Sequence, residues 1–233
     1  EYYCSTWGLP DFDAGQYAVI GLPGSAPRCR DAEPEDDPAE PQRLIKRAYS
    51  IASRSQAKQY LEFYIALVRS GALTPRLVLL KPGDGLWLGR KITGMFTLDS
   101  VPTQCHVILI ATGTGLAPYV SMMRSALADH PARRFAIVHG ARHSWELGYR
   151  EEMMALHRFC PGFEYIPIVS RPAEEPIPWG GLVGHCQDVW TRHVIDEVWG
   201  FTPRPETTHV FLCGNPAMIQ DMIELLAKDG FGE

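Results

Sequence analysis

Ala111-Thr-Gly-Thr-Gly-Leu-Ala-Pro118 follows a wholly apolar segment, residues 107–111, and precedes an amphipathic one. The apolar segment is typical of a strand in a parallel sheet that is covered on both faces. Gly113 and Gly115 would let the backbone of the next turn come close to a pyrophosphate, and Pro118 suits the first turn of a helix. The order predicts a strand, a phosphate-binding turn and a helix. Because a proline stands where the dinucleotide pattern has a third glycine, the motif alone is only moderately specific.

The chain on either side of this turn alternates between strand-like and helix-like segments from about residue 101 onward. Further strands are expected at 135–139, 164–169 and 209–213, and helices at 149–159, 183–190 and 216–228. Such alternation is typical of a doubly wound α/β domain, in which ligands bind at the carboxyl ends of the strands. The sequence therefore predicts a parallel-sheet domain over residues 101–233.

The first hundred residues show a different pattern of short strands separated by turns. Strands are expected at 16–22, 47–52, 61–68, 86–88 and 94–98, with a turn and a short helix between 71 and 80. This spacing indicates a small antiparallel barrel. Residues 24–43 are rich in proline and acid and have hardly any large apolar side chain, so we expect a mobile loop there.

Two polar positions on the predicted strands suggest chemistry. In Arg47-Ala-Tyr-Ser50, an arginine can fork onto a pyrophosphate and a tyrosine can offer a planar surface to a flavin ring. An edge strand with a solvated arginine is the alternative interpretation. Cys213 ends an apolar strand at the carboxyl edge of the sheet, where ligands bind. A small buried residue is the alternative for this cysteine.

Taken in order, these segments resemble the ferredoxin–NADP reductase family, most closely its bacterial flavin-containing members. The resemblance extends from about Phe12 to Phe231. It rests on Ala14-Gly-Gln-Tyr17, residues 47–53, Gly71-Ala-Leu-Thr-Pro-Arg-Leu77, Lys81-Pro-Gly-Asp84, the Gly113 turn, His139-Gly-Ala-Arg142 and Cys213-Gly-Asn-Pro216. It implies a two-domain protein with an antiparallel β-barrel over residues 1–100 that binds FAD. An α/β doubly wound domain over residues 101–233 would bind NADP(H).

The resemblance also implies roles around the flavin. Arg47 would bind the flavin phosphate, Tyr49 would lie against the flavin ring, and the Ser50 hydroxyl would hydrogen-bond flavin N5. Further flavin contacts are implied at Ala48, Phe63, Tyr64, Ile65, Gly71, Leu73 and Thr74. Core packing explains the three residues from 63 to 65 equally well, and Thr74 would also serve as an ordinary helix cap.

The implied nucleotide contacts lie in the second half of the chain. They comprise Thr112, Gly113, Thr114, Gly115, Pro118, Arg142, Arg171, His185, Cys213, Gly214, Asn215 and Pro216. Arg142 and Arg171 would face the adenosine 2′-phosphate. His185 stands where bacterial relatives often carry an arginine, and this departure predicts a weaker preference for NADPH. Ser50 and Cys213 are the expected catalytic residues, which would tune the geometry of hydride transfer without forming covalent bonds.

The resemblance predicts a flavoprotein oxidoreductase that moves a hydride between NADPH and FAD and single electrons to ferredoxin or flavodoxin in a transient complex. Two alternatives stay open: the reductase component of an oxygenase or a flavin reductase, and a non-catalytic electron-relay or regulatory subunit. Relatives have a strand before Ala14 and continue past Phe231, so we expect both ends of this chain to be incomplete.

Composition narrows the class of protein. A net charge of −5 provides no basic surplus for nucleic acid. The six cysteines include no Cys-x-x-Cys pair, which argues against a metal site, a disulfide framework and an iron–sulfur cluster. The longest apolar run, residues 107–111, is too short to cross a bilayer. We expect a cytoplasmic protein without a membrane or nucleic-acid partner. Among the possible oligomeric states, a monomer is expected.

Overall fold

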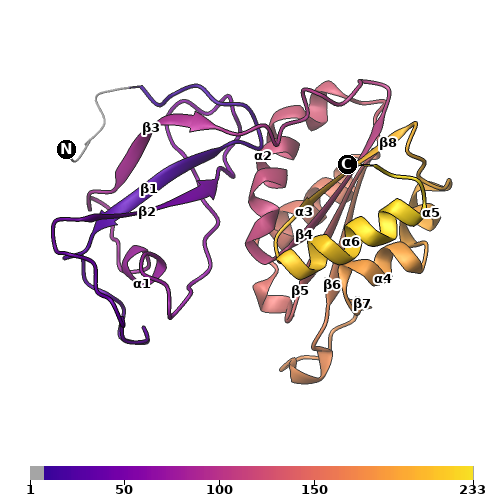
Figure 1. The fold of residues 1–233 in the computed structure, drawn as a ribbon. Coiled ribbons are helices and arrows are strands. Elements are labelled where there is room, and N and C mark those ends of the chain that lie inside the picture. The colour runs from indigo at the N-terminus through magenta and orange to yellow at the C-terminus, as the bar shows by residue number, and fades with distance from the viewer. Residues whose placement is uncertain (1–7, 233) are drawn as a thin grey trace.

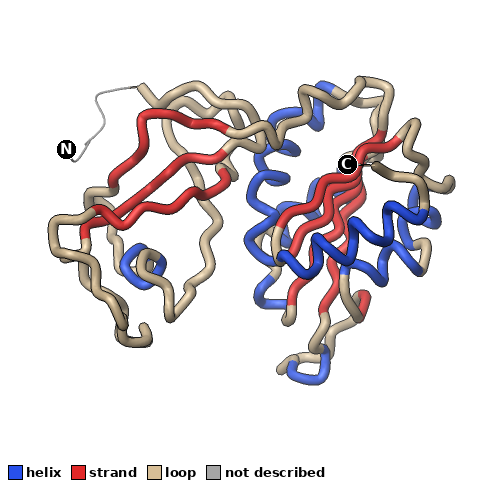
Figure 2. Tube along the Cα trace, in the orientation of Figure 1, coloured by secondary structure: helices blue, strands red, loops and turns tan. Residues whose placement is uncertain are grey.

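The computed structural model describes residues 8–232, which form two sheets that follow one another along the chain (Figure 1). The first sheet is antiparallel and has the order β2-β1-β3. Its strands are β1 (Tyr17–Pro23), β2 (Leu44–Ser50) and β3 (Trp87–Thr93), and the short helix α1 (Thr74–Leu77) lies beside them. Loops make up most of the remaining first half of the chain (Figure 2).

The second sheet is parallel, and its strand order is β7-β6-β5-β4-β8. Its strands are β4 (His106–Thr112), β5 (Phe135–Ala141), β6 (Phe163–Val169), β7 (Leu182–Val183) and β8 (Thr208–Cys213). The chain leaves β4 toward β5, β6 and β7 on one side and returns on the other side with β8. The strand order therefore reverses beside β4, which is where doubly wound folds bind ligands.

Helices cover both faces of the parallel sheet (Figure 1). They are α2 (Ala117–Ala126), α3 (Arg150–Phe159), α4 (Cys186–Thr191), α5 (Val194–Trp199) and α6 (Pro216–Lys228). Side chains of β4 alternate between the two faces: Leu109 joins a core with α2 and α3, whereas Ile108 and Ile110 join one with α4, α5 and α6. This double covering explains why the strand is apolar throughout. The expected fold class, an antiparallel unit followed by an α/β parallel-sheet unit, is confirmed.

Several local expectations were wrong. Residues 61–68 form only one bridge, between Phe63 and Ile51, and residues 94–98 form no strand. Phe96 instead stacks on Tyr119 of α2, with ring centroids 5.9 Å apart, so its apolar side chain packs on the core that Leu109 shares with α2 and α3. The predicted helix at 183–190 is divided into β7 and α4 by Gly184, whose φ of +134° is accessible to glycine. Helix α5 was not predicted.

Residues 24–43, expected to be a mobile loop, pack against α1. Glu35 accepts two hydrogen bonds from the guanidinium of Arg76, at 2.8 and 2.9 Å, and the Arg76 side chain is only 4% exposed. Arg28 donates to the backbone oxygens of Arg69 and Gly71 at 3.3 and 3.2 Å. Ion pairing and hydrogen bonding thus hold a segment that has too few apolar side chains to be held by burial. Within residues 8–232, no helix is long and apolar enough to cross a membrane.

Candidate functional site

The glycine turn after β4 has the conformation that its sequence predicts. Gly113 has a φ of +52° and begins a 3₁₀ turn that ends at Leu116, where α2 follows with Pro118 at its second position. An added Cβ at Gly115 would lie 2.5 Å from the backbone oxygen of Cys213, so only glycine fits there. This close approach joins the turn after β4 to the end of β8.

The turn after β8 is fixed to the same place. The backbone N–H of Asn215 donates to Thr112 Oγ1 at 2.7 Å. The Asn215 side chain then caps α6 by accepting from the N–H of Ala217 at 2.8 Å. Gly214 has a φ of +133°, and a Cβ there would collide with the Thr112 hydroxyl. The structure thus brings together the two glycine turns that are 100 residues apart in the sequence.

A buried histidine on β5, His139, holds the glycine turn by a hydrogen bond. His139 Nε2 lies 3.2 Å from the Gly113 carbonyl oxygen, and Nδ1 lies 3.0 Å from the Tyr165 hydroxyl. Because a carbonyl only accepts, Nε2 carries the proton, and the Tyr165 hydroxyl donates to Nδ1. Burial lowers the pKa of His139 to about 4, so the imidazole is neutral at physiological pH.

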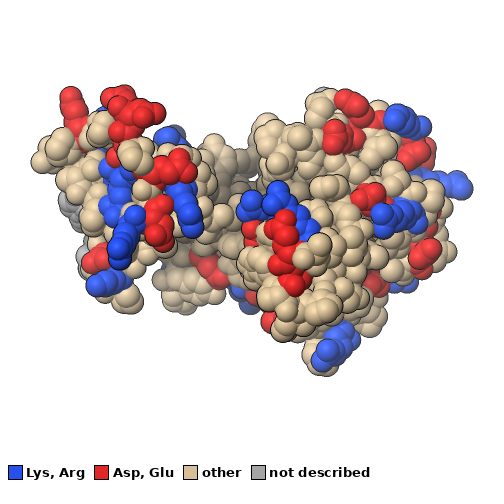
Figure 3. All heavy atoms as spheres, turned by 90° about the horizontal axis from the view of Figure 1, so that it is seen from below, with Lys and Arg blue, Asp and Glu red and all other residues tan. Residues whose placement is uncertain are grey.

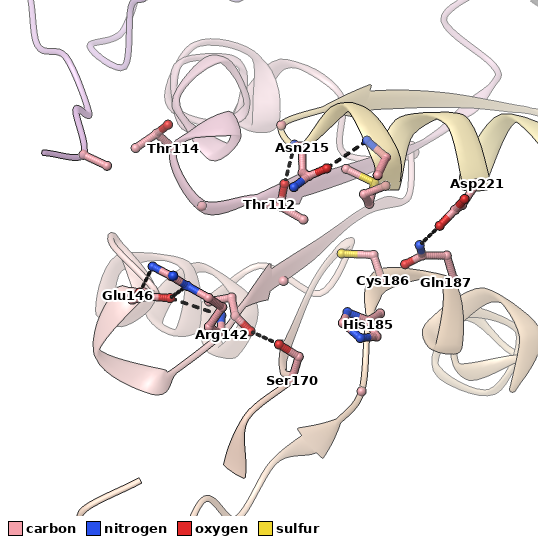
Figure 4. A pocket seen from close by; sticks show the side chains of 18 of the residues that line it. Thr112, Thr114, Arg142, Glu146, Ser170, His185, Cys186, Gln187, Asn215 and Asp221 are labelled. Atoms are coloured by element: carbon pink, nitrogen blue, oxygen red, sulfur yellow. Dashed lines mark hydrogen bonds and ion pairs between the residues drawn. The ribbon is translucent and has the colours of Figure 1, made fainter. Parts of the chain in front are cut away.

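A cavity of about 960 Å³ opens at the carboxyl ends of β4, β5, β6 and β8 (Figure 4). Eight of the sequence-predicted residues line it: Tyr64, Thr112, Gly113, Thr114, Arg142, His185, Gly214 and Asn215. Tyr64 and Ala66 come from the first half of the chain, and the other lining residues come from the second half. The cavity therefore lies where the two halves meet.

Sequence reasoning missed other side chains in the lining, namely Glu146, Ser170, Cys186, Gln187, Met218 and Asp221. Ser170 directly follows β6, so its position at a strand's carboxyl end was a usable signal. Gln187 Nε2 donates to Asp221 Oδ2 at 2.8 Å, which closes one side of the cavity between α4 and α6. No local pattern links those two residues.

The two predicted 2′-phosphate arginines differ in position. Arg142 lines the cavity, and its Nη2 donates to Glu146 Oε1 at 2.6 Å. Arg171 is exposed and outside the described lining, with Nη1 3.6 Å from Glu174 Oε1. Burial tends to raise the pKa of Glu146, but the hydrogen bonds and charge of Arg142 outweigh it and hold that pKa below its usual value. His185 lies in the cavity, and its backbone N–H donates to Asp188 Oδ2 at 2.7 Å.

A second cavity of about 560 Å³ lies at the first sheet. Arg43, Lys46 and Arg47 line it together with Ala72, the residue after Gly71. Arg47 is exposed on β2, and its Nη1 donates to the Lys46 carbonyl at 2.7 Å. The structure thus places Arg47 and Ala72, the neighbour of Gly71, around one hollow, whose wall carries three cationic side chains and two acidic ones, Asp37 and Glu40.

Other predicted flavin residues have structural roles. Leu73 is buried with Leu22 and Ile45, and Tyr49 packs against that cluster. The Thr74 hydroxyl accepts from the N–H of Val68 at 2.9 Å and donates to its carbonyl at 3.1 Å. It ties the turn together; the N-cap position of α1 is Leu73. Phe63 packs on the core of the first sheet.

The remaining predicted residues do not line either cavity. Ser50 ends β2 and is half-buried, as is Ile65, while Ala48 is exposed. Pro118 is buried and Pro216 begins α6. Cys213 ends β8 beside Gly115, and burial raises the pKa of its thiol. Neither cavity is lined by Ser50 or Cys213 as far as the described residues go.

Contacts between the two halves fix the wall of the cavity. The Tyr64 hydroxyl donates to the Glu146 carbonyl at 3.0 Å and accepts from the N–H of Gly148 at 3.1 Å.

In the described part of the chain, no group of three or more His, Cys, Asp or Glu side chains could hold a metal ion.

The sequence of the chain is similar to those of known oxidoreductases. Residues 109–224, which run from within β4 to within α6, match the family described as "Oxidoreductase NAD-binding domain". The flavodoxin/ferredoxin–NADP reductase of Escherichia coli strain K12 is 33% identical over 90% of this chain and 77% of its own length. The ferredoxin–NADP reductase of Azotobacter vinelandii is 32% identical over 95% of this chain and 80% of its own length.

Solved structures show the same fold. A ferredoxin NADP⁺ reductase from Neisseria gonorrhoeae, solved with bound FAD and NADP, superposes with a TM-score of 0.78 at 23% identity. The superposition covers 95% of this chain and 81% of that one. An Amycolatopsis cytochrome P450 reductase gives a TM-score of 0.75 at 27% identity, covering 96% of this chain and 59% of the other.

Proposed function

The chain belongs to the ferredoxin–NADP reductase family, and we propose that it moves a hydride from NADPH to a bound FAD and single electrons onward to ferredoxin or flavodoxin. The observation that carries this proposal is the cavity at the carboxyl edge of the parallel sheet. Its wall combines Tyr64 from the first half of the chain with the two glycine turns of the second half. A nicotinamide nucleotide bound on the sheet would therefore face a flavin held by the first half.

The division of labour that we propose places FAD binding in residues 1–100 and NADP(H) binding in residues 101–233. The residues present fit FAD, because Arg43, Lys46 and Arg47 outnumber Asp37 and Glu40 on the wall of a hollow beside Gly71, and the excess positive charge suits a pyrophosphate. Tyr64, whose hydroxyl is fixed at Glu146 and Gly148, would present its ring toward the flavin. When bound, FAD supplies the chemistry that turns one two-electron hydride into single electrons.

For the nucleotide, we propose that Gly113, Thr114 and Asn215 bind the pyrophosphate and nicotinamide end. The turns after β4 and β8 leave open space at Gly113, where an added Cβ would meet nothing within 4 Å. The hydrogen bond from the Asn215 N–H to Thr112 Oγ1 joins the two turns, and His139 Nε2 holds the Gly113 carbonyl, so little ordering is needed on binding. Arg142 would form a charge-assisted bond with the 2′-phosphate that distinguishes NADPH from NADH.

Ser50 and Cys213 would act by positioning. Cys213 lies at the end of β8 next to the glycine turn, and its raised pKa keeps the thiol protonated at neutral pH. A protonated thiol is a poor nucleophile, so this residue is suited to packing beside the nicotinamide and not to covalent chemistry. Most of the rate would then come from holding the two rings at the correct distance and angle.

The electron acceptor would bind transiently, and we propose that the chain acts as a cytoplasmic monomer. On the face shown in Figure 3, basic side chains of the N-terminal part lie in a row, with acidic side chains beside and between them. The basic side chains would pair with acidic groups on a protein acceptor, and that attraction weakens with rising salt. The test is NADPH-driven reduction of a purified ferredoxin or flavodoxin. Transfer that is fast at low salt supports the proposal, and flavin that is reduced without electron transfer to either acceptor contradicts this part of it.

A further inference from the structure

Glu146 binds the cation to which we assign the 2′-phosphate. Its Oε1 accepts from Arg142 Nη2 at 2.6 Å, and its Oε2 accepts from Arg142 Nε at 3.3 Å. The backbone N–H of Arg142 also donates to Oε2, at 3.2 Å. One carboxylate thus occupies the Nε–Nη2 edge of the guanidinium, one of the two edges that can fork onto a phosphate (Figure 4).

The backbone at Glu146 is held firmly, which keeps this carboxylate in the cavity. Residues 144–146 form a 3₁₀ turn, and the Glu146 carbonyl accepts from the Tyr64 hydroxyl at 3.0 Å. The N–H of Ser144 donates to Glu175 Oε1 at 2.6 Å, so the start of the turn is tied as well. A ligand can therefore move the Glu146 side chain by rotating it, but cannot carry the acid away from the site.

We propose that Glu146 is a specificity-determining residue that competes with the 2′-phosphate of NADPH for Arg142. This inference rests on the proposed function. A 2′-phosphate that binds Arg142 must either displace the carboxylate or bind the Nη1 side of the guanidinium with the carboxylate still in place, and in both cases the two anions lie close together and repel each other. NADH has a 2′-hydroxyl in place of the phosphate, so it avoids this repulsion and can donate a hydrogen bond to the acid.

The consequence is a site with a limited preference for NADPH. Arg171, the second cation assigned to the phosphate, also faces an acid, with Nη1 3.6 Å from Glu174. Glu174 is exposed and is shared with His143, whose Nε2 lies 2.8 Å from Oε2. Of the two acids, Glu146 has the stronger effect because it lines the cavity and is the less exposed.

The test measures binding of two probes to the flavin-loaded protein by calorimetry: 2′-phospho-AMP and 5′-AMP. Glu146→Gln removes the charge but keeps the size of the side chain. It should tighten 2′-phospho-AMP by about five- to tenfold and leave 5′-AMP unchanged or weaker, since a tenfold change needs only about 1.4 kcal/mol. The control is Glu151→Gln on α3, an exposed acid with no ion pair or side-chain hydrogen bond in the described chain.

Two results would overturn the inference. One is a ratio of the two dissociation constants that Glu146→Gln leaves unchanged; the other is an equal tightening by Glu151→Gln, which would mean that only net charge matters. In an Arg142→Ala background, Glu146→Gln should have much less effect, and a full effect there would show that Arg142 is not the shared group.

The proposed function is tested separately by NADPH reduction of the flavin in the wild-type protein. If NADPH reduces the flavin but the ratio does not respond to Glu146→Gln, only the role of Glu146 fails. If the wild-type protein binds neither 2′-phospho-AMP nor NADPH, the proposed function and this inference fail together.

Discussion

Arg124 Nη1 on α2 lies 2.8 Å from Glu62 Oε2, an ion pair that joins the parallel-sheet unit to the segment between β2 and β3. The same guanidinium binds both oxygens of Glu152 on α3, each at 2.7 Å. The Tyr149 hydroxyl donates to the other Glu62 oxygen at 2.6 Å. Although burial alone would raise the pKa of Glu62, these hydrogen bonds hold it below its usual value. The carboxylate is therefore satisfied on both oxygens.

Replacing Arg124 by Met should destabilise the protein by about 2–4 kcal/mol, because two partly buried carboxylates lose their partner. The control is Lys58→Met, which breaks an ion pair with Asp11 whose side chains are 53% and 91% exposed. That change should cost far less, because an exposed ion pair contributes little to stability. Urea unfolding measures both values, and equal losses in the two variants would show that the Arg124 network adds no more than a surface pair.

His139 predicts a pH dependence of stability. Burial lowers its folded-state pKa to about 4, below the ordinary value of 6.5, so the unfolded chain binds the proton more readily. The contribution of neutral His139 is complete above about pH 6.5 and declines as pH falls toward 4. It should be smaller by about 2 kcal/mol at pH 5 than at pH 7.

His139→Gln should remove most of this slope in urea unfolding between pH 7 and pH 5. Burial also lowers the pKa of His106, which titrates in the same sense, so His106→Gln measures its share. If His139→Gln unfolds with the same pH slope as the wild-type protein, the imidazole is not held neutral by the glycine turn.

Arg47→Ala should weaken FAD binding by about 1.5–3 kcal/mol, the usual contribution of a hydrogen bond to a charged group. Arg90→Ala is the matched control, because Arg90 is exposed on β3 and lies outside the described lining of the second cavity. Flavin fluorescence titration of the apoprotein gives both affinities. Equal FAD affinities for the two variants would contradict the assignment of a phosphate contact to Arg47.

Ser50→Ala and Cys213→Ala should each slow flavin reduction by NADPH while flavin remains bound. Because burial raises the pKa of the Cys213 thiol, no thiolate should form between pH 6 and 8. The rate of flavin reduction should therefore not rise with pH through ionisation of this thiol. Stopped-flow absorbance measures the step. Reduction at the wild-type rate in both variants would leave these residues with a packing role alone.

Local signals account for the parts of the fold that the sequence predicts well. Helix α6 (Pro216–Lys228) begins with an Asn cap and a proline and has the predicted bounds. The glycine turn was recognisable because its backbone conformation and close packing require glycine at two positions. In both cases, the deciding interactions join residues that are close in the sequence or that share one required residue type.

Long-range contacts explain the failures. Residues 61–68 have strand-like composition, but Glu62 and Tyr64 bind partners on α2 and in the segment just before α3. These partners lie 62 to 87 residues away in the sequence. The hydrogen bonds of Glu35 to Arg76 likewise order a segment whose composition indicates mobility. Glu146 was missed because its effect depends on Arg142 lining a cavity, which only the assembled sheet shows.

The most direct test of the central claim is the visible absorbance spectrum of the purified protein, recorded without oxygen before and after NADPH. We expect the bands of bound flavin near neutral pH and their loss on adding one equivalent of NADPH, with slower or weaker bleaching by NADH. A protein that takes up FAD but keeps its flavin bands in excess NADPH would contradict hydride transfer between the two sites, and so would one that binds no flavin.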